Sequence, residues 1–228
     1  MKALIYKELK LAMHPVCYVF IALFPLMTLI PDGYYPRAIG FIYILSCYPI
    51  LFLGANKGQQ SNDLLYSTLL PVRKKDIVLA RIMTVAFMQF VFMALCSCLV
   101  PLAFFLQNSI PPKAEADIPV GLGLNAFVLL LAVAIVGFAL ADLIFFPIYY
   151  KNGKSIVMST LLTILGFIVY LAVFTIALPF IIDPKNEVCN SIPLWIQFLF
   201  LGGALIVYVI IHFFVYKISA KKLEKVDF

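Results

Sequence analysis

Few side chains within the long apolar runs of this sequence could take part in chemistry. The runs contain one carboxylate, Asp142, together with Asn125, His212 and scattered serines and threonines. Catalysis inside a membrane would require a constellation, such as histidines and carboxylates around a metal or a serine beside a base. We find no such constellation, and the P-loop pattern G-x-x-x-x-G-K-S/T does not occur. The sequence therefore predicts a protein that is not an enzyme and that holds no metal, nucleotide or other cofactor itself.

Asp142 is nevertheless the most unusual of these residues. An ionised carboxylate near the centre of a bilayer costs about 3 kcal/mol on insertion scales, so we expect Asp142 to face other helices or a wet cavity. Two interpretations stay open, a structural hydrogen bond to a neighbouring helix and a role in transport. We expect no intramembrane cation beside Asp142, which makes it a weak candidate for a proton relay. His212 is expected at the cytoplasmic end of its run, as an interfacial histidine.

The elements that position these residues are predicted to be membrane spans. Of the 228 residues, 64% are hydrophobic and 12% are charged, whereas a soluble domain carries about 25% charged residues. The runs are long enough for helices that cross the hydrocarbon, and they lack the alternation of barrel strands. We predict an all-α integral membrane protein that forms a single domain over residues 1–228. The six transmembrane helices are expected at about 16–31, 38–55, 79–106, 120–147, 156–182 and 194–216.

The distribution of lysine and arginine predicts the orientation. If the N-terminus is cytoplasmic, three of the 17 cations, Arg37, Lys113 and Lys185, lie outside and the other 14 lie inside. This asymmetry satisfies the positive-inside rule, so both termini are expected in the cytoplasm of a multi-pass protein of the cell membrane. The net charge of +6 is then concentrated where it meets anionic lipid head groups. Membrane lipids are the expected partner, and nucleic-acid binding is an unnecessary explanation.

Small residues and cysteines give two further expectations. Gly166 and the run Gly202, Gly203 and Ala204 permit close helix contact, which we expect within one subunit. Cys96 and Cys98 point away from each other on a helix, so we expect neither a disulfide nor a metal pair. Cys189 is alone in a predicted outer loop. It is expected to be a free thiol, with an intermolecular bridge as the alternative.

The first thirteen residues, MKALIYKELKLAM, are amphipathic at helical spacing. They predict a helix that lies in the cytoplasmic interface, before the first span. Glu8 falls on the apolar side of this helix, which is an odd place for a carboxylate. It either pairs with a cation from a neighbouring segment or is a frayed, solvated position.

The largest polar stretch, residues 55–76, is expected on the cytoplasmic side between the second and third predicted spans. Its middle predicts a short helix, with Ser61 or Asn62 as N-cap and Pro71 as the stop. Its leucines form an apolar patch outside the bilayer. This patch either packs against the protein's own helix ends or the membrane interface, or it docks a cytoplasmic partner. The candidate docking residues are Asp63, Leu64, Leu65, Tyr66, Leu69, Leu70, Pro71, Arg73, Lys74 and Lys75.

Two stretches resemble the ABC-2 type permeases of ATP-binding-cassette exporters. They are the KEL of Lys7, Glu8 and Leu9 and LLYSTLLPVRKKDIVLARI at residues 64–82, where Arg81 stands at a position that is often Lys in the family. In that family a similar stretch follows the coupling helix, which fits a groove on the ATPase. The resemblance implies that ATP and Mg²⁺ are bound by a separate ATPase subunit. It also implies that two permeases pair, as a homodimer or with a sister chain, and that the N-terminal helix slides along the interface.

The small size and short outer loops are most similar to the compact permeases that export phenol-soluble modulins, which are short amphipathic peptides. This similarity implies an amphipathic or hydrophobic cargo that crosses a bacterial cell membrane outward, by alternating access or lateral entry. The family's re-entrant helices between the last two spans would have to fit within residues 178–193.

Two alternatives come from other functional classes. One is the six-helix substrate-binding subunit of an energy-coupling-factor importer, although the first predicted span lacks the small-residue motifs through which such subunits dock. The other is a membrane immunity or sensor protein that transports nothing. An enzyme of lipid metabolism is disfavoured because catalytic residues do not cluster.

Overall fold

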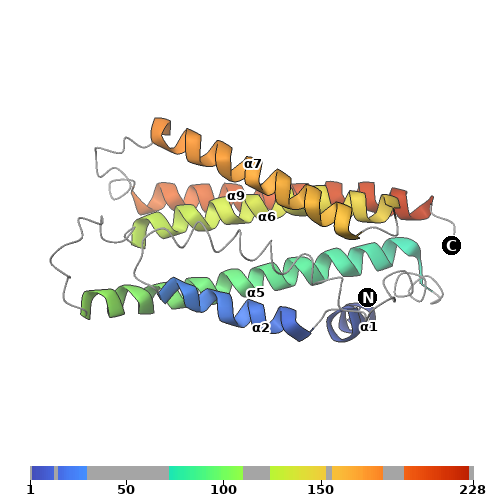
Figure 1. Ribbon diagram of the computed structural model, residues 1–228, viewed down its shortest axis with the longest axis horizontal. Coiled ribbons are helices and arrows are strands. Elements are labelled where there is room, and N and C mark those ends of the chain that lie inside the picture. Colours follow the sequence, from blue (N-terminus) through green and yellow to red (C-terminus); the bar gives the residue numbers. More distant parts are fainter. Residues whose placement is uncertain are drawn as a thin grey trace.

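The computed structural model describes residues 2–12, 15–29, 72–109, 124–152, 156–181 and 193–225. The elements in these ranges are helical, and Figure 1 shows the long helices lying roughly side by side. The prediction of an all-α protein is therefore confirmed for the described residues. In chain order the elements are α1 (Lys2–Lys7), the π-helical turn η1 (Glu8–Ala12), α2 (Pro15–Leu23), the 3-10 helix η2 (Phe24–Leu29), α5 (Lys74–Ser109), α6 (Leu124–Asn152), α7 (Ile156–Ile181) and α9 (Leu194–Glu224).

Among the described residues, three helices are long and apolar enough to cross a bilayer: residues 74–99 of α5, 131–151 of α6 and 195–224 of α9. In hydrocarbon an apolar segment folds as a helix, because each backbone N–H and C=O group then has a hydrogen-bond partner within the same segment. The predicted span at 38–55 and the predicted coupling helix at 61–71 lie outside the described residues. The six-span topology and the cytoplasmic placement of both termini therefore stay predictions.

The last helix extends beyond the apolar run that predicts it. α9 continues to Glu224, eight residues past the expected end of the sixth span at residue 216. Its last turn carries Lys221 and Lys222, and cations are favourable there because the C-terminal end of a helix is partially negative. The Lys222 ammonium donates a hydrogen bond to the Pro147 carbonyl of α6 over 3.0 Å. The end of α9 is thereby attached to α6.

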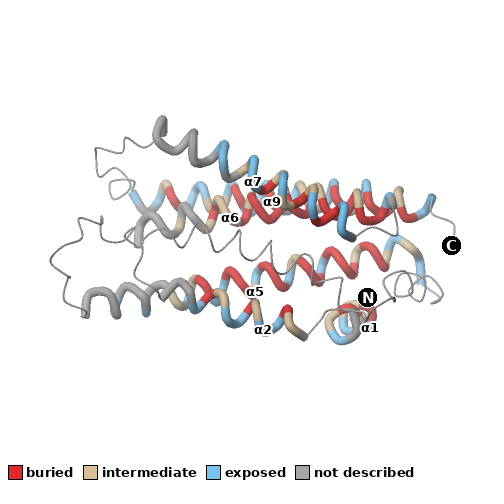
Figure 2. The backbone as a smooth tube through the Cα atoms, in the orientation of Figure 1, coloured by how far each residue is buried: buried red, intermediate tan, exposed pale blue. Residues whose placement is uncertain are grey.

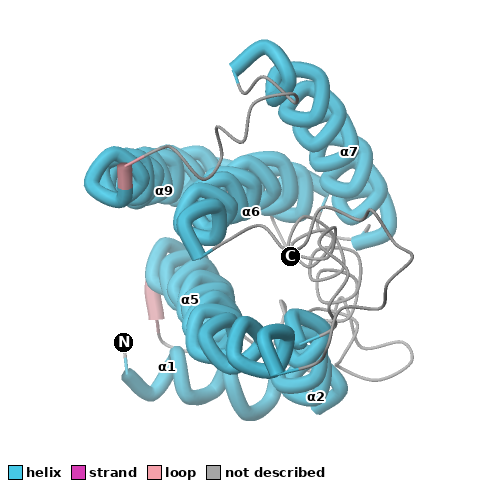
Figure 3. Tube along the Cα trace, turned by 90° about the vertical axis from the view of Figure 1, so that its left-hand side faces the viewer, coloured by secondary structure: helices cyan, strands magenta, loops and turns pink. Residues whose placement is uncertain are grey.

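α6 is the central helix of the core. It packs most extensively against α9 and then against α7, and Figure 3, the view along the helices, shows α6 between them. Figure 2 shows that much of the described part of α6 is buried, whereas α7 is more exposed. Phe138 of α6 meets Phe92 of α5 edge to face, with ring centroids 6.4 Å apart. The outer faces are also apolar, since Leu165 and Ile206 are 61% and 63% exposed. Such faces suit contact with lipid tails rather than with water.

Glycines mark the close contact between α6 and α7. A Cβ atom added at Gly137 would lie 2.8 Å from a Phe167 ring carbon and 3.1 Å from a Tyr170 ring carbon, and one added at Gly166 would overlap the Ile144 side chain. The expectation of packing within one subunit is thus met at Gly166. It is also met at Ala204, which is buried in the core. At Gly202 and Gly203 it is wrong, because added Cβ atoms there would meet nothing within 4 Å. These two glycines face open space instead of a neighbouring helix.

Replacing Gly137 by Ala should lower the free energy of unfolding by about 1–3 kcal/mol, the usual cost of overpacking. The Tyr170 ring cannot move aside freely, because its hydroxyl donates a hydrogen bond to the Val133 carbonyl over 2.9 Å. Replacing Gly203 by Ala is the matched control and should leave stability almost unchanged. Thermal unfolding of the full chain in detergent would measure both. Equal destabilisation by the two variants would contradict the described α6–α7 contact.

Candidate functional site

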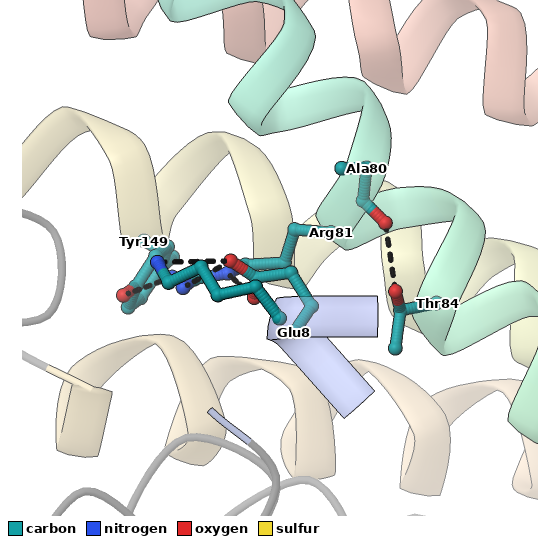
Figure 4. Close-up of polar contacts among 6 residues, drawn as sticks. Glu8, Ala80, Arg81, Thr84 and Tyr149 are labelled. Carbon is teal, nitrogen blue, oxygen red and sulfur yellow. Dashed lines mark hydrogen bonds and ion pairs between the residues drawn. The ribbon is translucent and has the colours of Figure 1, made fainter. Parts of the chain in front are cut away.

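A buried ion pair and a hydrogen bond connect residues 2–12 to two of the long helices, and we call residues 2–12 the N-terminal segment. Arg81 of α5 donates from Nε to Glu8 Oε2 over 2.8 Å and from Nη2 to Glu8 Oε1 over 3.2 Å. Its Nη1 donates to the hydroxyl of Tyr149, on α6, over 3.0 Å. Figure 4 shows the guanidinium between these two partners. We call Glu8, Arg81 and Tyr149 the Arg81 cluster.

Helical spacing brings Glu8 and Arg81 together. Leu4 and Glu8 are four residues apart and face α5, where Ile77 and Arg81 are also four residues apart. Leu4 and Ile77 belong to one small apolar cluster with Ala80. The apolar contact thus brings the N-terminal segment against α5, and the ion pair fixes its register. Of the two interpretations of Glu8, the structure shows the pairing with a cation from a neighbouring segment.

The ion pair is almost completely removed from solvent, with Glu8 and Arg81 each 2% exposed. A planar guanidinium can bind both carboxylate oxygens at once, which a lysine ammonium in the same position could not do. Lys7 adds a second cation 3.7 Å from Glu8. Because a buried charge that loses its partner is costly, this cluster holds the N-terminal segment, α5 and α6 in one arrangement.

A second cluster of polar side chains lies inside the predicted spans and joins α5, α6 and α9. The Gln89 amide donates to Asp142 Oδ2 over 2.9 Å, and the Tyr208 hydroxyl donates to Gln89 Oε1 over 2.6 Å. His212 Nε2 lies 3.0 Å from the same Asp142 oxygen, and its Nδ1 lies 2.9 Å from the Tyr208 carbonyl. The Tyr208 and His212 rings stack with centroids 4.0 Å apart. We call these four residues the Asp142 cluster.

Asp142 is not isolated within the membrane, because His212, a side chain that is a cation only when protonated, lies 3.0 Å from its Oδ2 atom. Asp142 is fully buried and faces His212 of α9, so His212 is part of the helix contact and not merely an interfacial histidine. As expected, Asp142 faces other helices, and it accepts a hydrogen bond from a neighbouring one. Gln89, Tyr208 and His212 were not among the predicted site residues. The available signal was that Gln89 is the one amide in residues 82–106.

The two clusters share the same pair of helices. Arg81 and Gln89 lie eight residues apart on α5, and Asp142 and Tyr149 lie seven residues apart on α6. Both separations are close to two helical turns, so each pair of residues lies on one face of its helix. The facing sides of α5 and α6 therefore carry both polar contacts.

Three of the candidate docking residues, Arg73, Lys74 and Lys75, lie where α5 begins. Val72 and Arg73 are exposed, and the Arg73 carbonyl accepts from the N–H groups of Asp76 and Ile77 over 2.9 and 3.4 Å. Lys75 forms an ion pair of 3.2 Å with Glu224 at the end of α9, and both side chains are about half exposed. The other candidate docking residues, 63–66 and 69–71, lie outside the described residues.

The described residues contain no group of three or more His, Cys, Asp or Glu side chains that could hold a metal ion. Cys17, Cys96 and Cys98 are free thiols, whereas Cys189 lies outside the described residues.

The sequence also matches a model of a known protein family. The family is described as "ABC-2 family transporter protein", and the match covers residues 3–224. No curated protein and no solved structure gives a significant match. The matched range includes every residue of the Arg81 and Asp142 clusters.

Replacing Arg81 by Gln should lower the free energy of unfolding by about 3–5 kcal/mol, because it leaves the Glu8 carboxylate buried without its main partner. Lys7, 3.7 Å from Glu8, should offset part of that cost. Replacing Glu8 by Gln should also destabilise the protein, and the double variant should lose less than the sum of the two single changes. Denaturant unfolding of the full chain in detergent would give the coupling free energy.

Lys75 and Glu224 provide the matched control, since they form an ion pair of 3.2 Å with half-exposed side chains. Their double-variant cycle should give only about 0–1 kcal/mol, as is usual for pairs screened by water. A coupling free energy for Arg81 and Glu8 as small as that of the control would mean that the buried pair does not hold the N-terminal segment.

Proposed function

This chain belongs to the ABC-2 family of transporter membrane proteins, and from this membership we propose that it is the permease subunit of an ATP-binding-cassette exporter. It moves an amphipathic or hydrophobic cargo outward, using ATP that a separate subunit hydrolyses. The observation that carries the proposal is the family match over residues 3–224. The match favours a permease over an importer's substrate-binding subunit or a sensor that transports nothing.

The proposed ATPase contact is the segment that ends where α5 begins. Residues 61–71 form the coupling helix in this proposal, and Arg73, Lys74 and Lys75 flank it. α5 is 36 residues long, or about 54 Å at the rise of an α-helix. A displacement at the ATPase therefore reaches the membrane interior along one continuous helix. Arg81, within the first turns of α5, passes the displacement to the N-terminal segment and to α6.

The proposed cargo is supported by a groove between α6, α7 and α9. Its volume is about 710 Å³, and its walls are almost wholly apolar, with Val136, Tyr170, Trp195 and Gly203 among the lining residues. An open, apolar groove of this size fits several hydrophobic side chains or part of an acyl chain. Short amphipathic peptides such as phenol-soluble modulins present a suitable apolar face. Two permeases, identical or sister chains, would pair over two ATPase subunits in a bacterial cell membrane.

Charge reversal of Arg73, Lys74 and Lys75 to Glu, or replacement of Leu65 and Leu69 by Asp, should reduce the amount of ATPase that co-purifies with the chain. The first change inverts the charge beside the docking segment, and the second places carboxylates in its apolar patch. Purification in mild detergent from the native membrane, with quantification of the ATPase per permease, would measure the effect.

The control for this experiment is Lys10→Glu, which reverses an exposed cation of the N-terminal segment and should leave co-purification unchanged. Undiminished ATPase recovery with both docking variants would rule out residues 61–75 as the contact. Absence of any ABC-type ATPase from the wild-type preparation would count against the exporter itself.

Replacing Gly203 by Phe should reduce export several-fold, because the ring would occupy the apolar groove. A Cβ atom added at Gly203 would meet nothing within 4 Å, so the fold should tolerate the larger residue. ATP-dependent uptake of a fluorescent amphipathic helical peptide into inside-out vesicles would report export. Ile206→Phe is the matched control, since Ile206 is 63% exposed and is not among the groove residues. Unchanged uptake with Gly203→Phe, or an equal loss with both variants, would exclude the groove as the cargo site.

A further inference from the structure

The Asp142 cluster has a hydrogen-bonding requirement that determines its proton content. The Nδ1 atom of His212 lies 2.9 Å from the Tyr208 carbonyl oxygen. A carbonyl oxygen can only accept a hydrogen bond, so the Nδ1 atom must carry a hydrogen. The position of ring protons follows here from the partners that surround the ring.

The other ring nitrogen faces an acceptor as well. His212 Nε2 lies 3.0 Å from Asp142 Oδ2, and one hydrogen must lie between these atoms for the contact to be attractive. Two arrangements provide it. Either the ring is an imidazolium that donates to a carboxylate, or a neutral ring accepts from a protonated carboxyl group. The pair holds the same two protons in both arrangements, and its net charge is zero.

We propose that Asp142 and His212 form a proton-binding site inside the membrane, in which one shared proton joins α6 to α9. Removal of that proton would place a lone pair of the Nε2 atom against a carboxylate oxygen. It would also leave a net negative charge at a fully buried position, where an ionised side chain is costly. The site therefore keeps its proton as long as the two helices stay packed, and releases it when they separate and water enters.

The neighbouring helices supply neutral groups to this pair. α5 contributes the Gln89 amide, whose N–H donates to Asp142 Oδ2, and α9 contributes the Tyr208 phenol, which donates to the Gln89 carbonyl. The amide orientation is fixed, because its oxygen accepts from Tyr208 while its nitrogen donates to Asp142. Breaking the shared proton contact would therefore also disturb the attachment of α5.

The nearest cations along these helices lie elsewhere. Arg81 is eight residues before Gln89, about 12 Å along α5, and binds Glu8 and Tyr149. On α9 the exposed Lys217 lies with its ammonium 4.5 Å from the Phe213 ring centroid. On α6 the next charged residue after the pair is the exposed Lys151. The sequences of α2, η2 and α7 contain no charged residue. The proton between His212 Nε2 and Asp142 Oδ2 keeps this pair neutral.

Nuclear magnetic resonance of the imidazole nitrogens tests this proposal in the full chain in lipid nanodiscs. The sequence has two histidines, so His14→Gln leaves the His212 ring as the single labelled signal. At pH 8 an isolated imidazole is neutral. We expect either two protonated ring nitrogens, or a ring protonated at Nδ1 together with an infrared band of a protonated carboxyl group. Asp142→Asn should abolish the second protonated nitrogen or the carboxyl band.

The wild-type measurement decides the question even if Asp142→Asn fails to fold. A neutral ring protonated at Nε2, with a bare Nδ1, would overturn the proposal. A ring protonated at Nδ1 without a protonated carboxyl band would overturn it too, because no shared proton would then be present. If a folded Asp142→Asn variant kept whichever signal the unchanged chain shows, the second protonated nitrogen or the carboxyl band, the proton would belong to another group. The assignment to this pair would then be wrong. None of these outcomes depends on the cargo or on the ATPase.

Discussion

A charged side chain inside a membrane protein needs a partner, because hydrocarbon cannot solvate it. This constraint determines how the described helices fit together. The Arg81 guanidinium is satisfied by Glu8 and Tyr149, and the Asp142 carboxylate by groups from α5 and α9. Apolar surfaces can slide past one another at little cost in lipid, since lipid tails are as apolar as leucine. Polar contacts are formed in one register only. The two clusters therefore specify how α5, α6 and α9 align.

The position of α5 gives these contacts a mechanical role in the proposed exporter. The helix begins beside the proposed ATPase contact, carries Arg81 near its start and carries Gln89 about two turns further on. In this proposal a displacement of α5 moves the N-terminal segment through Glu8 and the α6–α9 pair through Asp142. If α5 contacted its neighbours through apolar surfaces alone, the helices could slide past one another and the displacement of α5 would not reach them. Buried polar contacts transmit it because breaking them exposes charge to hydrocarbon.

The helices could be predicted from the sequence, whereas their mutual orientation could not. Long apolar runs have few alternatives to the helix in a membrane, and α5, α6, α7 and α9 begin within five residues of the starts of the corresponding predicted spans. Glu8 was recognisable as a carboxylate on an apolar face. His212 could not be assigned to Asp142, because the two residues are 70 apart and lie on helices that are apolar all round. Gly202 and Gly203 could not be assigned to open space either. That assignment depends on how α9 is rotated about its own axis, and a helix that is apolar all round does not indicate this.

The rigid connection between the N-terminal segment and α5 is the central claim, and one distance measures it most directly. Spin labels at Tyr6 and Met83 would report it in a cysteine-free chain bound to its ATPase, since both positions are more than half exposed. We expect a single narrow distance distribution that is the same without nucleotide and with ATP, and that broadens when Arg81 is replaced by Gln. A distribution that shifts on ATP binding in the otherwise unchanged chain would contradict the claim, because the two segments would then move independently.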